Sequence, residues 1–486
     1  MAIKETLQSQ IDKALTNFKR AKYQDAINIL ENLDEKNSNF LICWYLGHSY
    51  FRIYNYLTAI KYIKKSIKLK TPDELNQNFL GEVLLQSNQY EEAIDSFKNV
   101  IKINEQNVNS IFNLGKIYSQ QGKFELAKKY YDKILKIDKN NLEVLYELIK
   151  IDKKNLLIDT VRVLKNQDNQ NDKNDKNDIY RNFILAEKAK KSKNFRDEVD
   201  YLIQGHKEYL KIKKKASFQE NNYFTNLLPQ FVKKFNKTDL NIKNENRPIF
   251  IMGLPRSGTT MIENLIFSSD NQIIRGDETD VMGKVFFSNQ IISNYEDINL
   301  NTNYDFTLKA LENLKKEITN KYNQIRMDIS EGLFTDKSLE NFLYIDILYK
   351  IFPNAKFIYC KRNYLANFLG ILKVFLPNLL WSHSIEKIMI FMELYQNKLN
   401  EVLSNKYIDI KIIEIENFSE DPLNNSRELF EFLDLKWTKN IFDKKNEKEM
   451  VIKTLSNLQV RNKITQHDLS YLENYIPFLK NYGIKI

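Results

Sequence analysis

The chain has 486 residues, of which 43% are hydrophobic, and a formal net charge of +10. This length predicts two or three domains, and the composition supports a sizeable core. Basic and acidic residues are mixed along the chain, so we interpret the charge as solvated helix faces and expect no nucleic-acid partner. Only two cysteines, Cys43 and Cys360, are present, which argues against a disulfide framework. The four histidines are scattered, so no metal site is expected.

Targeting and membrane-spanning segments are not predicted either. The N-terminal stretch MAIKETLQSQIDKAL is amphipathic and lacks the apolar core of a signal peptide. No uninterrupted apolar run reaches the length of a membrane span. Because the cysteine usage suits a reducing compartment, we expect a cytoplasmic protein.

A repeat with a period of 34 residues begins the chain, as the spacing of Gly47, Gly81 and Gly115 shows. An aromatic residue precedes an alanine by three positions in each unit, and the members are Tyr23–Ala26, Tyr56–Ala59, Tyr90–Ala93 and Phe124–Ala127. This period is the tetratricopeptide (TPR) signature and predicts an all-α solenoid over residues 1–165. We expect each glycine to let the second helix of its pair approach closely, with the alanine filling that contact. The last unit, from residue 141, is degenerate, because Ile149 replaces the glycine.

Three further regions follow the repeats. Residues 166–178, NQDNQNDKNDKND, form a fully polar, low-complexity linker that cannot bury enough surface to become ordered by packing. Residues 179–245 return to a helical pattern and are predicted to bridge to a domain at 246–486. The repeat half is either a scaffold without a ligand or a concave surface for a peptide or partner chain, and the sequence leaves both open.

The domain at 246–486 is organised around the stretch PIFIMGLPRSGTTMIEN, residues 248–264. An apolar strand, a glycine-bounded loop and a helix follow one another here. Loop amides and a helix N-terminus together favour an anion. The spacing of Gly253 and Gly258 resembles a P-loop, but Thr259 occupies the place of its lysine and the cation, Arg256, lies inside the loop. The loop is therefore predicted to hold a phosphate, though not ATP in the usual way.

Several segments of strand and helix are predicted beyond the loop. The segment IIRGDET at 273–279 precedes a helical insertion at 301–328, and FTDKSLENF follows at 334–342. Buried strands are predicted at 357–360 and 410–415, with an amphipathic helix between them at 384–404. Short apolar strands separated by helices predict an α/β three-layer domain with a central parallel sheet.

The loop sequence GLPRSGTT resembles the 5′-phosphosulfate loop of sulfotransferases that use 3′-phosphoadenosine 5′-phosphosulfate (PAPS). With the repeats, the chain resembles bacterial tetratricopeptide-repeat sulfotransferases, which are relatives of the tyrosylprotein sulfotransferases. The likeness covers nearly the whole chain. The resemblance implies transfer of a sulfuryl group from PAPS to a hydroxyl acceptor, and the repeat surface suggests a polypeptide acceptor.

Site residues follow from the same resemblance. The 5′-phosphosulfate would be held by loop and helix residues, which are Arg256, Ser257, Gly258, Thr259 and Thr260. Glu278 would be the base that accepts the acceptor's proton, with Asp277 as the alternative. Lys337 and Ser456 would assist the leaving group, together with Arg256. Arg362 would bind the 3′-phosphate, and Arg461 or Lys463 would add positive charge to the phosphates.

The chain departs from the family pattern at three positions of the 3′-phosphate and adenine site. Gly370 replaces a serine, Ile415 replaces a tyrosine that meets the adenine, and Tyr471 replaces a basic residue. We expect Ile415 to offer an apolar wall to the purine. Two other functions stay open: a TPR interaction scaffold with a degenerate, inactive sulfotransferase-like domain, and an ATP-dependent phosphotransferase, which the missing lysine disfavours.

Overall fold

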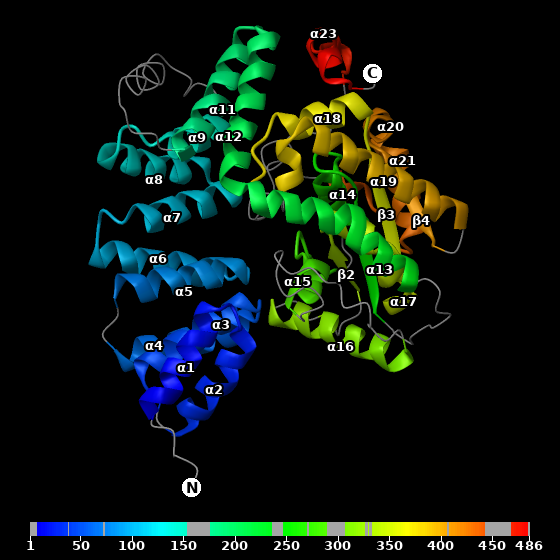
Figure 1. The fold of residues 1–486 in the computed structure, drawn as a ribbon. Coiled ribbons are helices and arrows are strands. Elements are labelled where there is room, and N and C mark those ends of the chain that lie inside the picture. Colours follow the sequence, from blue (N-terminus) through cyan, green and yellow to red (C-terminus); the bar gives the residue numbers. More distant parts are fainter. Residues whose placement is uncertain are drawn as a thin grey trace.

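The computed structural model describes residues 7–36, 38–70, 73–152, 175–235, 246–269, 272–288, 307–325, 329, 333–405, 408–442 and 468–484. A solenoid of helices leads into an α/β domain that lies beside it (Figure 1). None of the helices in these ranges is both long and apolar enough to cross a membrane.

Within the described residues, the solenoid consists of antiparallel helix pairs followed by one further helix. The helices are α1 (Leu7–Lys19), α2 (Tyr23–Lys36), α3 (Phe40–Arg52), α4 (Tyr56–Leu69), α5 (Glu74–Gln86), α6 (Tyr90–Ile103), α7 (Val108–Gln120), α8 (Phe124–Ile137) and α9 (Leu142–Ile151). The aromatic residue of each repeat begins the second helix of its pair. The period of 34 residues therefore predicts the helix pairs correctly.

The repeat glycines face a different partner from the one predicted. A Cβ at Gly81 would lie 2.6 Å from Phe97 Cε1, and one at Gly115 would lie 2.5 Å from Tyr131 Cε1. Each of these large side chains comes four residues after the repeat alanine, one turn further along the second helix. The alanines are fully buried, as at Ala93. The close approach of the helices is as expected, but a large side chain rather than the alanine fills the space over the glycine.

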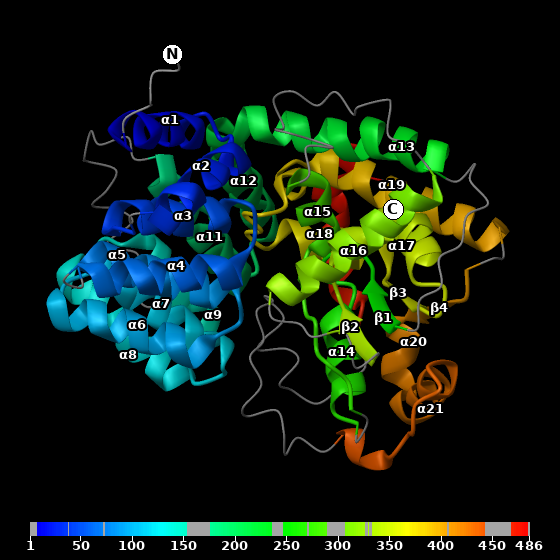
Figure 2. The ribbon, with the colours of Figure 1, turned by 90° about the horizontal axis from the view of Figure 1, so that it is seen from below.

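Helices α11 (Asp175–Lys191), α12 (Phe195–Asn222) and α13 (Leu228–Phe235) connect the solenoid to the α/β domain, with a π-helical turn η2 (Tyr223–Leu227) between the last two. Helix α13 crosses one side of the α/β domain (Figures 1 and 2). Phe183 of α11 and His206 of α12 both pack against residues of the α/β domain. The polar linker predicted at 166–178 lies mostly outside the described residues.

The α/β domain contains a four-stranded parallel sheet. Its strands are β1 (Arg247–Met252), β2 (Leu333–Asp336), β3 (Lys356–Lys361) and β4 (Ile410–Glu414), in the order β2-β1-β3-β4. In the register, Phe250 of β1 lies beside Asp336 of β2 and Phe357 of β3. Because all strands run in one direction, their carboxyl ends meet at one edge.

Both faces of the sheet are buried, so the strands read as apolar runs. Ile249 and Ile251 pack on one face with α14 (Thr259–Phe267), α20 (Ile415–Glu420) and α21 (Pro422–Phe432). Phe250 and Met252 pack on the other face, against helices η3 (Leu339–Tyr344), α17 (Ile345–Ile351), α18 (Tyr364–Leu372) and α19 (Ile385–Asn405). The predicted three-layer α/β domain with a central parallel sheet is confirmed.

The other described elements lie around this core. Helices α15 (Val281–Ser288) and α16 (Leu308–Gln324) lie on the side of the domain that faces α3 and α4 (Figure 2). Short helices complete the chain: η4 (Leu380–His383), η5 (Lys439–Phe442), η7 (Ser470–Asn474), α23 (Ile476–Leu479) and η8 (Lys480–Tyr482).

Candidate active site

The loop between β1 and α14 has the backbone shape of an anion site. Gly253, Arg256 and Gly258 adopt positive φ angles of 151°, 68° and 93°. A Cβ at Gly253 would lie 2.5 Å from the carbonyl oxygen of Cys360, so only glycine fits there. Helix α14 begins at Thr259, and the first amides of a helix have no intrahelical partner. Loop amides and helix amides therefore meet beyond the end of β1.

The hydroxyl of Ser257 supports a ligand in this loop. Its side chain is 1% exposed, and its Oγ has no hydrogen-bond partner in the described part of the chain. Buried polar atoms are normally paired. Burial and the nearby Arg362 guanidinium lower the pKa of Arg256 to about 10, so two cations lie close together beside the loop. An anionic ligand would satisfy the hydroxyl and offset the repulsion between the cations.

Lys337 lies directly after β2 and is fully buried. Its Nζ is 2.9 Å from Glu278 Oε1 and 3.0 Å from Asp277 Oδ1. Burial alone would lower the pKa of Lys337, but the carboxylates of Glu278, Asp277 and Glu263 raise it above its usual value. Lys337 is therefore a charged ammonium in the neutral pH range.

The neighbouring Asp336 fixes the turn that carries Lys337. Asp336 Oδ2 accepts hydrogen bonds from the hydroxyls of Thr279 and Tyr322, and Oδ1 accepts from the Ser338 amide and hydroxyl. The side chain is fully buried. A carboxylate with four donors cannot move without breaking them, so the backbone at Lys337 is rigid.

Glu278 and Asp277 differ in their access to solvent. The side chain of Glu278 is 41% exposed, whereas that of Asp277 is 13% exposed. The amide of Lys337 donates to the carbonyl of Asp277 at 2.8 Å, which ties Asp277 to the end of β2. Glu278 is therefore the carboxylate that an incoming molecule can reach.

Arg362 lies directly after β3. Its Nη1 donates to the carbonyl of Arg256 at 2.9 Å, and its Nε is 4.0 Å from Glu416 Oε1. Asn367 of α18 donates to the carbonyl of Pro255 at 2.6 Å. Two side chains of the β3–α18 segment thus hold the loop between β1 and α14 from one side.

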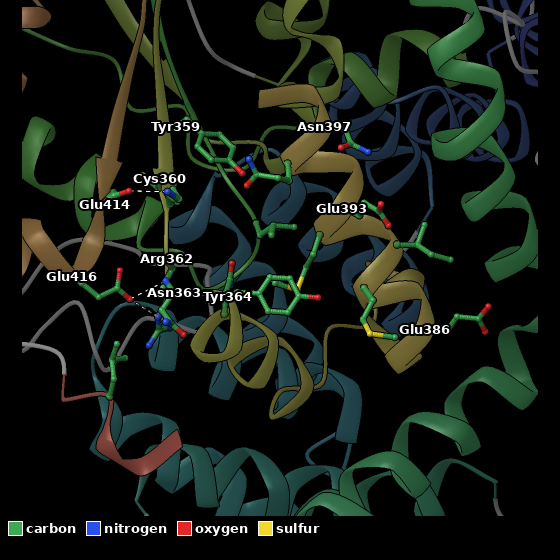
Figure 3. Close-up of a pocket in the computed structure, with 18 of the residues that line it drawn as sticks. Tyr359, Cys360, Arg362, Asn363, Tyr364, Glu386, Glu393, Asn397, Glu414 and Glu416 are labelled. Carbon is green, nitrogen blue, oxygen red and sulfur yellow. Dashed lines mark hydrogen bonds and ion pairs between the residues drawn. The ribbon is translucent and has the colours of Figure 1, made fainter. Parts of the chain in front are cut away.

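A pocket of about 850 Å³ opens beside Arg362. Leu254 of the loop, Tyr359 of β3 and Glu414 of β4 line one side, and α19 lines the other. Figure 3 shows Arg362 and Asn363 next to Glu416, with Glu393 on α19 across the pocket. Glu278 and Lys337 do not line this pocket. The pocket has room for a nucleoside, while Glu278 and Lys337 lie on the other side of the loop.

The strand order explains this division. Lys337 follows β2, the loop follows β1 and Arg362 follows β3, and these three strands are neighbours in the order β2-β1-β3. The charged groups therefore line up along one edge of the sheet, with Lys337 and Glu278 on one side of the loop and Arg362 on the other. Open α/β sheets bind their ligands at this edge.

Two of the three positions that depart from the family pattern lie against the loop. A Cβ at Gly370 would lie 3.1 Å from Arg256 Cβ, so a serine there needs a shift of Arg256. Ile415 is 2% exposed and packs over Gly258, where a Cβ would lie 2.4 Å from Ile415 Cδ1. The expectation of an open apolar wall at Ile415 is therefore wrong, because the loop covers this side chain. Ser456 and Arg461 lie outside the described residues.

Two sets of site residues were missed by sequence reasoning. Glu263, Arg275 and Thr335 form a buried polar group behind Asp277 and Glu278. In the sequence, the only signal of this group was Glu263, a glutamate within the otherwise apolar pattern of α14. The second set is the side of α19 that lines the pocket. It carries polar residues such as Glu393 and Gln396 together with Met392 of the apolar stripe, which sequence reasoning treated only as core. That stripe is buried as predicted, for example at Phe391.

The fold, together with the charged groups at the carboxyl ends of the strands, defines an α/β domain whose loop after β1 is suited to an anion. Comparison with known proteins shows which families parts of this chain resemble. Residues 248–439 match the model of the sulfotransferase family. Residues 81–122 match a TPR repeat model, and residues 108–141 match a tetratricopeptide repeat model. The chain is therefore similar to tetratricopeptide repeats over residues 81–141 and to the sulfotransferase family over residues 248–439.

Individual relatives are distant. An uncharacterized protein of Aquifex aeolicus (strain VF5) is 27% identical over 251 residues, which cover 48% of this chain and 31% of that protein. The crystal structure of sulfotransferase STF9 from Mycobacterium avium is 12% identical, covering 68% of this chain and 97% of that one, with a TM-score of 0.28. The crystal structure of MamA is 20% identical, covering 37% and 96%, with a TM-score of 0.29.

Proposed function

We propose that this protein transfers the sulfuryl group of PAPS to a hydroxyl of an acceptor. The observation that carries the proposal is the order of groups along the sheet edge: Glu278 and Lys337, then the anion-binding loop, then Arg362 beside a pocket. PAPS has the same order of parts, with a reactive sulfate at one end, a phosphate next to it, and a nucleoside with a second phosphate at the other end.

The donor would lie across the loop. Amides and hydroxyls of Ser257, Gly258, Thr259 and Thr260 would hold the 5′-phosphosulfate, as helix N-termini hold phosphates. Arg256 would add positive charge. Arg362 would bind the 3′-phosphate, with the nucleoside in the neighbouring pocket, and Arg461 would add charge from its C-terminal segment.

Four residues would carry the chemistry. Glu278 would accept the proton of the acceptor hydroxyl as its oxygen forms a bond to sulfur. The bond from sulfur to the bridging oxygen breaks, and its electron pair stays on adenosine 3′,5′-bisphosphate. Lys337, Arg256 and Ser456 would stabilise the charge that develops on this leaving phosphate. Lys337 already contacts Glu278 at 2.9 Å, so base and cation lie side by side.

The repeats lie beside these reactive groups, which favours an acceptor bound between the two halves. Lys321 of α16 donates to the carbonyl of Ile53 at 2.9 Å, so the solenoid contacts the α/β domain here. The pKa of Tyr90, at the start of α6, is raised by burial and by the charge of Asp277. Because TPR surfaces commonly bind extended chains, we propose a polypeptide as the acceptor.

Ligand binding and transfer test the proposal separately. Adenosine 3′,5′-bisphosphate should raise the melting temperature more than ATP does, since a ligand of the native state stabilises it. Arg362→Gln should weaken that shift, whereas Lys356→Gln, at the opposite end of β3, should not. Transfer of labelled sulfate from PAPS to a peptide library would establish the activity. A larger effect of ATP would favour a phosphotransferase, and binding without transfer to any acceptor would favour an inactive scaffold.

A further inference from the structure

Glu263 lies behind the reactive carboxylates, in the middle of α14. Its side chain is fully buried. Its Oε1 accepts a hydrogen bond from the amide of Asp277 at 3.0 Å and another from the Thr335 hydroxyl at 3.0 Å. Its Oε2 lies 3.2 Å from a guanidinium nitrogen of Arg275. The carboxylate therefore has neutral donors on one oxygen and a cation beside the other.

Thr335 completes a short chain of hydrogen bonds. Its Oγ1 accepts from the amide of Gly276 at 3.1 Å and donates its own proton to Glu263. The amides of Gly276 and Asp277 are thus both tied to Glu263, one through Thr335 and one directly. These are the two residues immediately before Glu278, so their positions decide where the Glu278 side chain starts.

Three segments that are distant in sequence meet at this carboxylate. Glu263 belongs to the helix that begins at the phosphate-binding loop, Thr335 belongs to β2 just before Lys337, and Asp277 precedes Glu278. Asp277 has a φ of 57°, in the left-handed region that aspartate tolerates better than most residues other than glycine, and its amide is held there by Glu263. The network therefore links the sites of the phosphate, the base and the cation.

We propose that Glu263 is a positioning residue that holds Glu278 and Lys337 at a fixed distance from the phosphate-binding loop. This inference rests on the proposed function, because it concerns the groups assigned to sulfuryl transfer. Burial raises the pKa of the Glu263 carboxyl, while the Arg275 guanidinium lowers it. In its ionised form Glu263 has a second effect, since its charge is one of those that keep Lys337 protonated. A merely structural network would stabilise the fold without affecting the rate of transfer.

The hydroxyl of Thr335 offers a clean test. Thr335→Val removes the hydroxyl and keeps the branched shape, whereas Thr335→Ser keeps the hydroxyl. Glu263→Gln keeps an oxygen acceptor and removes the charge. Displacing a reacting group by about 1 Å can cost about 100-fold in rate. We expect Thr335→Val and Glu263→Gln to lower kcat by roughly 10- to 100-fold. The dissociation constant of adenosine 3′,5′-bisphosphate should change less than about 3-fold, and Thr335→Ser should restore most of kcat.

Several results would overturn the proposal. One is unchanged kcat in both Thr335→Val and Glu263→Gln, and another is a parallel loss of kcat, nucleotide binding and melting temperature. If the unaltered protein transfers no sulfate, the proposed function fails, and a crystal structure of Thr335→Val then decides the positioning role. A shifted 276–278 segment with a broken contact between Lys337 and Glu278 would support that role, and an unchanged segment would exclude it.

Discussion

Replacing Glu278 by Gln should separate the chemical step from donor binding. The substitution keeps the size of the side chain and removes its ability to accept a proton. A general base contributes about 100- to 10,000-fold to rate, so kcat for sulfuryl transfer should fall by roughly this factor. Glu278 lies on the β2 side of the loop, away from the pocket beside Arg362, so binding of adenosine 3′,5′-bisphosphate should be nearly unchanged.

The structure also limits the effect of this substitution on stability. The Glu278 side chain is 41% exposed, and Lys337 keeps Asp277 as a partner at 3.0 Å. Ion pairs with an exposed member contribute up to about 1 kcal/mol. The free energy of unfolding should therefore fall by less than about 1 kcal/mol in urea titrations.

The assay measures transfer of labelled sulfate from PAPS, with calorimetry of adenosine 3′,5′-bisphosphate in parallel. Asp277→Asn is the matched variant, because it removes the other carboxylate from Lys337. We expect a smaller loss there, since Asp277 is mostly buried against Lys337. Equal losses of binding and transfer in Glu278→Gln, or a larger loss of transfer in Asp277→Asn, would refute the assignment of the base.

Three further substitutions test other parts of the molecule. Gly258→Ala places a Cβ on a residue with a φ of 93°, only 2.4 Å from Ile415. We therefore expect adenosine 3′,5′-bisphosphate to bind about tenfold more weakly in calorimetry. Unchanged binding would show that the loop shape is not required. Gly81→Ala would bring a Cβ to 2.6 Å from Phe97, which should cost about 1–3 kcal/mol of unfolding free energy in urea. A cost below about 0.5 kcal/mol would contradict this close packing. Burial lowers the pKa of His206 to about 4, so the unfolded chain binds more protons than the folded one between pH 6.5 and 4. His206 should therefore contribute a loss of about 3 kcal/mol of stability on acidification through this window. His206→Phe should remove this contribution and flatten the slope, whereas an equal slope in the variant would exclude this histidine as a cause.

The sequence predicted those parts of the molecule that depend on local patterns. The repeat period located the helix pairs, and the glycine-bounded loop after an apolar run located β1 and α14. Strand β2 was not predicted, because its four residues, Leu333–Asp336, are too short and too mixed in character to show a periodicity. It is a strand because it pairs with β1, a contact between residues far apart in the chain.

The site was predictable where a residue acts through its place in a motif. Lys337 and Arg362 occur at the ends of strands, and the sheet brings them to one edge. The role of Glu263 could not be read from the sequence, because it depends on three segments meeting at one carboxylate. The burial of Ile415 likewise follows from the glycine opposite it, which provides space for that side chain.

The hydrophobic interior that begins in the second repeat continues without a break into the α/β domain. Tyr56 of the solenoid and Phe357 of the sheet belong to one buried cluster, and the ring of Phe183 of α11 packs against that of Phe375 at 5.5 Å between centroids. Cutting the chain between the repeats and the sheet would therefore expose apolar surface on both fragments, and each would tend to aggregate when expressed alone. Heating of the intact protein should melt both halves in a single transition.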